Sequence, residues 1–199
     1  MTLAPLQHRS AAFWDNVYTR PDTIFEPIPP SERRLLQDRA GVALGQHAMD
    51  IGTGLGEWAC QMAKIGLQVT GYDCSRVAIE RARELHSEHG GALRFEAHDF
   101  DADAIPSPLQ TGSLDLVSCR HSLQFLEIPR LIADVRRWLR PDGVLHVTTA
   151  VTEKLRDGRK IGMPEEHVQA LAQDWREHDR YDLDAHGEIT VVILRGPYG

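Results

Sequence analysis

The segment of the chain best suited to chemistry is a seven-residue run in which one carboxylate precedes three alternating glycines. It reads Asp50-Ile51-Gly52-Thr53-Gly54-Leu55-Gly56 and lies between a short apolar run and a helical pattern. Glycine permits unusual φ angles and lets a ligand approach the backbone closely. A carboxylate can accept hydrogen bonds from a ligand's ammonium group, directly or through water. The segment predicts a small-ligand site whose binding residues are Asp50, Gly52, Thr53, Gly54 and Gly56.

The spacing of these glycines argues against a nucleotide phosphate as the ligand. A dinucleotide-binding loop follows the pattern GxGxxG, whereas the spacing here is GxGxG and Glu57 stands where the third glycine is needed. A carboxylate is a poor neighbour for a pyrophosphate, and the Walker phosphate-loop pattern is absent from the sequence. S-adenosylmethionine (SAM) has no phosphate, and its amino-acid end and ribose can lie against a bare loop. SAM is therefore the predicted ligand.

Two further acidic residues follow the next two predicted strands. Asp73 comes 21 positions after Gly52 and is followed by Cys74, and the pair Asp99-Phe100 follows the third strand. An acid at the end of the second strand can accept hydrogen bonds from both ribose hydroxyls. Asp99 can accept from the adenine amino group while Phe100 covers the ring, although each acid can instead cap a turn. Three acids in register with the glycines favour a cofactor site, in which we include Cys74.

The residues after the fourth predicted strand, Ser118-Cys119-Arg120-His121-Ser122, are candidates for the side of the site that binds the methyl acceptor. His121 titrates in the range of a general base, which a hydroxyl or ammonium acceptor needs and a thiolate does not. It can equally cap the next helix or contact the adenosine. Arg120 can hold the cofactor's carboxylate or pair with a surface acid. Cys119 is interpreted as a buried small residue.

An aromatic N-terminal arm and a polar loop supply the candidates for closing the site. Trp14, Tyr18 and Phe25 lie in residues 1–30, where prolines exclude a continuous helix. They are predicted to form an apolar lid over cofactor and acceptor, or else a hydrophobic staple without ligand contact. Arg159 belongs to the polar run 154–160, which is a solvated loop or a mobile flap over an anionic substrate.

The elements that must position these residues alternate strands with helices, which is typical of an α/β domain with a mainly parallel sheet. Helices are predicted at 12–18, from after Ser31 to about Ala43, at 57–65, from a Ser75 cap to about Glu88, at 129–139 and at 164–173. Strands are predicted at 47–51, 67–73, 93–97, 114–118, 144–148, 175–183 and 188–195. A turn at 141–143 precedes the fifth strand, and 184–187 joins the last two.

Composition and charge narrow the classes of function. The 199 residues suffice for one domain, with 1–30 as its arm and 31–199 as its body. A formal net charge of -7 opposes nucleic-acid binding, and no apolar run predicts a membrane span or a signal peptide. Three cysteines without CxxC spacing and ten scattered histidines predict neither disulfides nor a metal site. We expect a cytoplasmic enzyme for small molecules, monomeric or a small homo-oligomer.

These motifs together resemble the class I SAM-dependent methyltransferases over about residues 45–150. Beside the glycine loop, the resemblance rests on Tyr72-Asp73, Asp99-Phe100, 114–117 and 139–145, where Asp142 replaces the first glycine of the family's Pro-Gly-Gly turn. It implies a Rossmann-like α/β fold: a seven-stranded, mostly parallel sheet with helices on both faces and an antiparallel last strand. It also implies SAM as cofactor, S-adenosylhomocysteine as product, and in-line transfer to a sulfur, selenium, oxygen or nitrogen atom of a small molecule.

Within that class the chain resembles the tellurite-resistance and thiopurine methyltransferase-like group. The resemblance rests on the short chain, on Phe13-Trp14-Asp15 and on the tail 162–187. The sequence departs from the group's pattern at 181–184, which reads Tyr-Asp-Leu-Asp where the tellurite proteins carry a His-Arg pair. This departure opposes tellurite chemistry and leaves the scaffold intact.

Three other functions stay open on the sequence alone. A natural-product O- or N-methyltransferase uses the same cofactor with another acceptor. An NAD-dependent oxidoreductase is opposed by Glu57, which stands where its loop needs a glycine. A protein that keeps SAM without catalysis, or has lost it, is opposed by the glycines together with Asp73.

Overall fold

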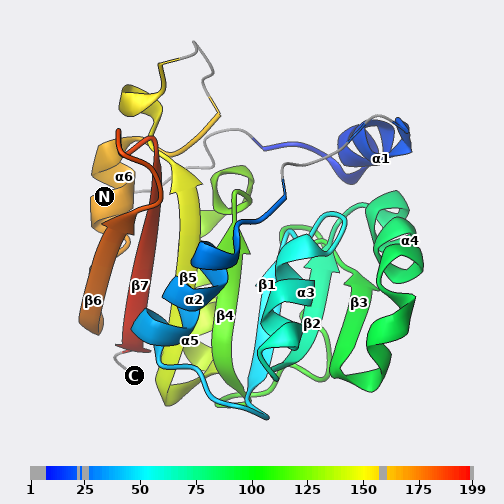
Figure 1. Ribbon diagram of the computed structural model, residues 1–199, viewed down its shortest axis with the longest axis horizontal. Coiled ribbons are helices and arrows are strands. Elements are labelled where there is room, and N and C mark those ends of the chain that lie inside the picture. Colours follow the sequence, from blue (N-terminus) through cyan, green and yellow to red (C-terminus); the bar gives the residue numbers. More distant parts are fainter. Residues whose placement is uncertain (1–7, 22, 24–26, 157–160, 198–199) are drawn as a thin grey trace.

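A seven-stranded sheet forms the centre of the computed structural model, which describes residues 8–21, 23, 27–156 and 161–197 (Figure 1). Its strands are β1 (His47–Ile51), β2 (Gln68–Asp73), β3 (Leu93–Ala97), β4 (Leu114–Arg120), β5 (Leu139–Ala150), β6 (Trp175–Asp182) and β7 (Ile189–Pro197). They are ordered β3-β2-β1-β4-β5-β7-β6 across the sheet. The first five pair in parallel, and β7 runs antiparallel to both β5 and β6. The predicted sheet with its antiparallel last strand is confirmed.

Helices cover both faces of this sheet, as predicted. On one face, α2 (Pro30–Ala40), α3 (Glu57–Lys64) and α4 (Arg76–Leu85) contribute buried side chains such as Leu36, Met62 and Ile79 to one core cluster. On the other, α5 (Ile128–Trp138) and α6 (Glu165–Ala170) contribute Trp138 and Val168 to a second cluster. The short α1 (Ala11–Thr19) lies away from the sheet and contacts α4 (Figure 1).

Local signals set several helix boundaries as the sequence predicts. The Ser75 side chain caps α4 by accepting a hydrogen bond from the Ala78 amide at 3.1 Å. Ser10 caps α1 in the same way through the Phe13 amide at 3.3 Å. Pro129 lies in the first turn of α5, where its missing N–H leaves no helical hydrogen bond unmade.

The second helix differs from its prediction at both ends. It begins at Pro30, so Ser31 lies inside the helix and is not its cap. The fixed φ of proline is already suited to a first helical turn, which explains the earlier start. The helix ends at Ala40 rather than near Ala43, because Gly41 adopts a left-handed φ of 64°.

The largest remaining differences lengthen two strands and shorten two helices. β4 continues to Arg120, and β5 begins at Leu139, so the predicted turn at 141–143 lies within the bounds of β5. In place of a helix to Glu88, α4 ends at Leu85 and a 3-10 helix, η1 (Ser87–Ala92), follows. The predicted helix 164–173 contracts to the six residues of α6. Two further 3-10 turns are η2 (Leu123–Phe125) and η3 (Thr152–Lys154).

The connection between the last two strands is held by one acidic side chain. Asp184 Oδ1 accepts hydrogen bonds from the amides of His186 and Glu188, and Oδ2 accepts one from the Ile189 amide at 2.7 Å.

Among the described residues, none of the helices has the length and apolar character needed to cross a membrane.

Candidate active site

Two adjoining hollows lie where β1, β2 and β4 end, at the carboxyl edge of the sheet. They share four lining residues: Trp14, Tyr18, Gly52 and His121. The first hollow is also lined by Asp73, Cys74, Asp99 and Phe100. The second is also lined by Asp50, Thr53, Gly54 and Arg120. The structure thus brings the predicted cofactor residues together at one edge, except Gly56, which is not among the lining residues.

The glycines of the loop cannot be replaced without strain. Gly52, Gly54 and Gly56 have φ angles of 69°, 55° and 84°, in the left-handed region that side chains rarely adopt. A Cβ on Gly52 would overlap the Ser122 side chain, and one on Gly54 would lie 2.7 Å from the Tyr18 hydroxyl. The alternating glycines therefore serve both the backbone turn and its close packing against the rest of the site.

Asp50 is a buried carboxylate. It is 1% exposed and accepts a hydrogen bond at Oδ2 from the Thr53 hydroxyl at 2.7 Å. Burial raises the pKa of Asp50 to about 7, against the opposing effects of the Thr53 hydrogen bond and the Arg120 charge. Its Oδ1 atom has no hydrogen-bond partner among the described residues. A buried acceptor of this kind is suited to a ligand's ammonium group.

Asp73 holds the glycine loop against the end of β2. The Oδ2 atom of Asp73 accepts a hydrogen bond from the Gly54 amide at 2.9 Å. The Oδ1 atom accepts one from the Ser75 amide, also at 2.9 Å. Burial raises the pKa of Asp73, and these two amides oppose the rise. Asp73 also lines the first hollow, where ligand hydroxyls can donate to its carboxylate. The neighbouring Cys74 thiol has its pKa raised to about 12, chiefly by burial, and is a lining group rather than a nucleophile.

Asp99 and Phe100 lie in the first hollow and also have structural roles. Asp99 Oδ1 accepts hydrogen bonds from the amides of Asp101 and Ala102, so it caps the turn after β3. The Phe100 ring packs edge-on against His98, with centroids 4.6 Å apart, and is 8% exposed. Phe100 is therefore an apolar wall anchored in the core, and the adenine contacts of this pair stay predictions.

The first helix is fastened over the site by an acid in its middle. Asp15 Oδ1 accepts hydrogen bonds from the Ser75 hydroxyl at 2.7 Å and from the Val77 amide at 3.3 Å. The Arg81 guanidinium, on α4, donates to the Tyr18 carbonyl at 2.6 Å. Ser75 thus binds the first helix through Asp15 and also caps α4. These bonds hold α1 where two of its aromatic residues, Trp14 and Tyr18, line both hollows.

Arg120 is paired with an acid that the sequence did not single out. Its Nε and Nη2 atoms donate to the two carboxylate oxygens of Glu32, each at 3.1 Å. This bidentate pair fixes the guanidinium beside the second hollow. Glu32 is 9% exposed and lies on α2, 88 positions before Arg120. The position of Glu32 in the first turn of α2 does not by itself indicate a contact with Arg120.

His121 stands at the junction of the two hollows in an unusual backbone conformation. Its φ is 56°, its amide donates to the Thr148 carbonyl at 2.8 Å, and its carbonyl accepts from the Gln124 side chain at 2.9 Å. These bonds fix the backbone where β4 ends. Histidine is among the residues that tolerate this region, and such strain is concentrated at functional sites.

A buried polar chain behind the loop was also missed by sequence reasoning. The Trp58 indole donates to the Ser118 hydroxyl at 2.8 Å, and Ser118 Oγ lies 3.4 Å from His146 Nδ1. Burial lowers the pKa of His146 to about 4, so its imidazole is neutral at neutral pH. Trp58 lines the second hollow, so this hydrogen-bonded chain holds one of its lining side chains in place. The two other predicted lid residues, Phe25 and Arg159, lie outside the described residues.

Residues 49–147 match a family model described as a methyltransferase domain. The match begins in β1 and ends in β5, so it contains the glycine loop and all three strand-end acids. Residues 49–147 therefore form a methyltransferase domain with the class I SAM-dependent fold. The class uses SAM as methyl donor, in agreement with the predicted cofactor.

Two relatives of this methyltransferase are named ubiquinone biosynthesis O-methyltransferase. The protein from Cupriavidus pinatubonensis is 34% identical over 142 residues, which are 69% of this chain and 53% of the relative. The protein from Actinobacillus pleuropneumoniae serotype 5b is 27% identical over 152 residues, 74% of this chain and 63% of the relative. The chain thus spans less than two thirds of the length of these relatives. They support the class and leave the narrower tellurite and thiopurine grouping as a prediction.

Solved structures share the fold at low sequence identity. The N-methyltransferase NodS from Bradyrhizobium japonicum, solved with S-adenosylhomocysteine, has a TM-score of 0.71 and 18% identity, covering 94% of this chain and 98% of NodS. The cyclase SpnF has a TM-score of 0.71 and 17% identity, covering both chains completely. Because one neighbour is named for methyl transfer and the other for cyclisation, the fold by itself does not decide the reaction.

Proposed function

We propose that this methyltransferase transfers the methyl group of SAM to a hydroxyl oxygen of a small aromatic molecule. The observation that carries the proposal is the position of His121, which lines both hollows at the end of β4. A hydroxyl acceptor needs a base to remove its proton, and histidine titrates in the suitable range. The apolar side chains of Phe125 and Leu126 line the same hollow and suit an aromatic acceptor. The O-methyltransferase names of the sequence relatives agree with an oxygen acceptor.

The residues present fit SAM at both of its polar ends. Asp50 offers a buried, unsatisfied carboxylate oxygen for the ammonium group, and the paired Arg120 offers a cation for the carboxylate. Asp73, in the other hollow, has lone pairs for the ribose hydroxyls. The left-handed Gly52 lets the cofactor pass between the two hollows against bare backbone. Bound SAM supplies a methyl group on a good leaving group, the sulfonium.

The protein's own part in the reaction is alignment, exclusion of water and removal of one proton. In-line displacement at carbon is accelerated chiefly by holding nucleophile and methyl group in the reactive geometry. Trp14 packs edge-on against Phe125 with ring centroids 5.0 Å apart, so the fastened first helix closes an apolar lid over the site. We assign His121 as the group that accepts the hydroxyl proton. Cys74, Asp99 and Phe100 line the adenosine side in this proposal.

A panel of acceptors with labelled SAM tests the proposal directly. Phenols and catechols are expected to be methylated, and thiols, selenols and amines to react poorly. His121→Asn, chosen because asparagine also tolerates φ 56°, should lower kcat for the hydroxyl acceptor by about 10²- to 10⁴-fold with the SAM affinity preserved. His178→Gln, on exposed β6, is the matched control. Turnover of thiols alone, or an unchanged kcat in His121→Asn, would refute the base assignment.

The remaining expectations concern partners and location. The net charge of -7 supports a small-molecule substrate over nucleic acid, and we propose a cytoplasmic monomer or small homo-oligomer with 1–30 acting as the arm of the domain 31–199. The narrower tellurite and thiopurine grouping stays a prediction, and it rests on the short chain, on Phe13-Trp14-Asp15 and on the tail 162–187. Light scattering with size-exclusion chromatography gives the oligomeric state. In the acceptor panel, preferential turnover of selenols or thiols would favour the tellurite and thiopurine grouping over the hydroxyl acceptor proposed above.

A further inference from the structure

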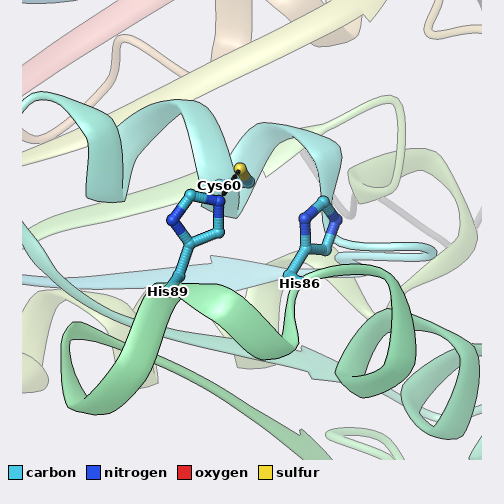
Figure 2. A group of neighbouring side chains, drawn as sticks. All are labelled: Cys60, His86 and His89. Carbon is cyan, nitrogen blue, oxygen red and sulfur yellow. Dashed lines mark hydrogen bonds between the residues drawn. The ribbon is translucent and has the colours of Figure 1, made fainter.

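Three metal-ligating side chains converge behind the glycine loop, outside both hollows. Cys60 extends from α3, while His86 and His89 extend from the end of α4 and from η1 (Figure 2). One ligand atom from each residue lies within 4.8 Å of the others. Cys60 Sγ and His89 Nε2 are only 3.1 Å apart. None of the three is among the lining residues of the cofactor hollows.

The local fold explains why these residues meet although they are distant in the sequence. His86 directly follows the last residue of α4, and its carbonyl accepts a hydrogen bond from the His89 amide at 3.1 Å, so a tight turn places both rings on one side. Their ring centroids are 6.0 Å apart. Cys60 is 3% exposed on the facing side of α3 and has no disulfide partner. A spacing of three between the histidines, with a cysteine on another helix, gave no recognisable metal motif.

The hydrogen bonding of His86 leaves one nitrogen ready to bind a cation. Its Nε2 lies 3.0 Å from the Leu55 carbonyl, which can only accept, so Nε2 donates and Nδ1 keeps its lone pair. Metal-binding histidines usually donate their second ring N–H to such a carbonyl or carboxylate. A neutral imidazole is the form of histidine that binds metal.

We propose that Cys60, His86 and His89 bind a divalent cation of the zinc class. Zn–S and Zn–N bonds of about 2.3 and 2.0–2.1 Å at a tetrahedral angle set sulfur and nitrogen about 3.5 Å apart. The Cys60 sulfur lies 3.1 Å from the His89 nitrogen, and one ligand atom of each of the three residues lies within 4.8 Å of the others. Small side-chain rotations suffice to bring these atoms to the spacing that zinc needs. Sulfur and imidazole ligands select against Mg²⁺ and Ca²⁺, which prefer oxygen.

Binding of the cation replaces the hydrogen bond between Cys60 and His89 with bonds to the metal. The Cys60 thiol releases its proton to solvent, and the thiolate binds the cation with His86 Nδ1 and His89 Nε2, while water occupies the fourth position. The site would fasten α3 to the end of α4. Because His86 also bonds the Leu55 carbonyl, the same link would brace the glycine loop from behind.

Cobalt(II) is the probe that reports the ligands. Tag-free protein is stripped with a chelator and titrated with Co²⁺, and we expect the thiolate-to-cobalt charge-transfer absorption, abolished by competing Zn²⁺. Cys60→Ser should remove this absorption, and His89→Gln should weaken metal affinity by at least about tenfold. Cys74→Ser and the exposed His178→Gln are matched controls that should keep both properties. Saturating Co²⁺ without charge-transfer absorption, or its persistence in Cys60→Ser, would overturn the proposal.

A second measurement avoids the buried cysteine substitution, which can unfold the protein. Calorimetry of Zn²⁺ binding to the wild-type chain in buffers of different ionisation enthalpy counts the protons released. We expect about one proton per metal at neutral pH, from the Cys60 thiol. Binding without proton release would show that Zn²⁺ is held by other groups than the Cys60 thiol, and no binding would show that these side chains form a hydrogen-bonded cluster only; either result would overturn the proposal.

Discussion

Replacing Asp50 by asparagine removes a buried charge while keeping the side chain's shape and its acceptor for Thr53. The pKa of Asp50 is about 7 in the folded chain and 3.8 ordinarily. Because the folded state then binds more protons than the unfolded state, the free energy of unfolding falls as pH rises between these two values. At about 1.4 kcal/mol per tenfold change, the full difference corresponds to roughly 4 kcal/mol. The full magnitude applies because the Asp50 side chain is only 1% exposed, so that solvent does not screen its charge.

The assay is urea unfolding of cofactor-free wild type and Asp50→Asn at pH 4.5 and pH 8. The free energy of unfolding of the variant, relative to wild type, should rise by about 3 kcal/mol between these pH values. Taking this difference cancels the pH-independent cost of an unsatisfied amide, about 1–3 kcal/mol. Asp38→Asn, on an exposed position of α2, is the matched control. If the difference between Asp50→Asn and wild type does not change with pH, Asp50 does not carry the buried charge assigned to it.

Three further predictions use the same site. Gly52→Ala should abolish SAM binding, because the added Cβ overlaps Ser122. It should also lower the free energy of unfolding by more than the 1–2 kcal/mol, roughly, that a left-handed alanine costs. The control is Gly45→Ala, at φ 80° with open space around it, which should show only the cost of the left-handed backbone. Asp15→Ala should speed SAM dissociation about tenfold, measured by stopped-flow, whereas the exposed neighbour Asn16→Ala should not; equal rates would contradict a lid fastened by Asp15. Asp50→Asn should weaken SAM binding about 10- to 100-fold by calorimetry, as loss of a charge-assisted hydrogen bond requires, and unchanged affinity would contradict the ammonium contact.

The sheet and the cofactor edge were predictable because they follow from local patterns. Alternating short strands and helices fix a parallel α/β sheet, and parallel strands place their carboxyl ends at one edge. Once Asp50 and Asp73 end neighbouring strands, their meeting around the glycines follows without knowledge of distant contacts. The serine cap of α4 was predictable for the same reason, since capping depends on residues three positions apart.

The contacts that escaped prediction join residues far apart in sequence. Glu32 meets Arg120 across 88 positions, and Ser118 meets Trp58 across 60. Nothing in the local pattern of either partner selects the other. The sequence predicts Ser31 as a cap, whereas Pro30 begins the helix because the fixed φ of proline already suits a first helical turn. The turn that joins His86 and His89 depends likewise on where α4 ends.

Calorimetric titration of the purified chain with SAM, and separately with NADH, tests the central claim most directly. The glycine loop, the unsatisfied Asp50 oxygen and the Asp73 carboxylate predict one SAM molecule per chain, bound with a Kd of about 1–100 µM, and no comparable heat from NADH. A Kd for SAM weaker than about 1 mM, or tighter binding of NADH than of SAM, would contradict the account.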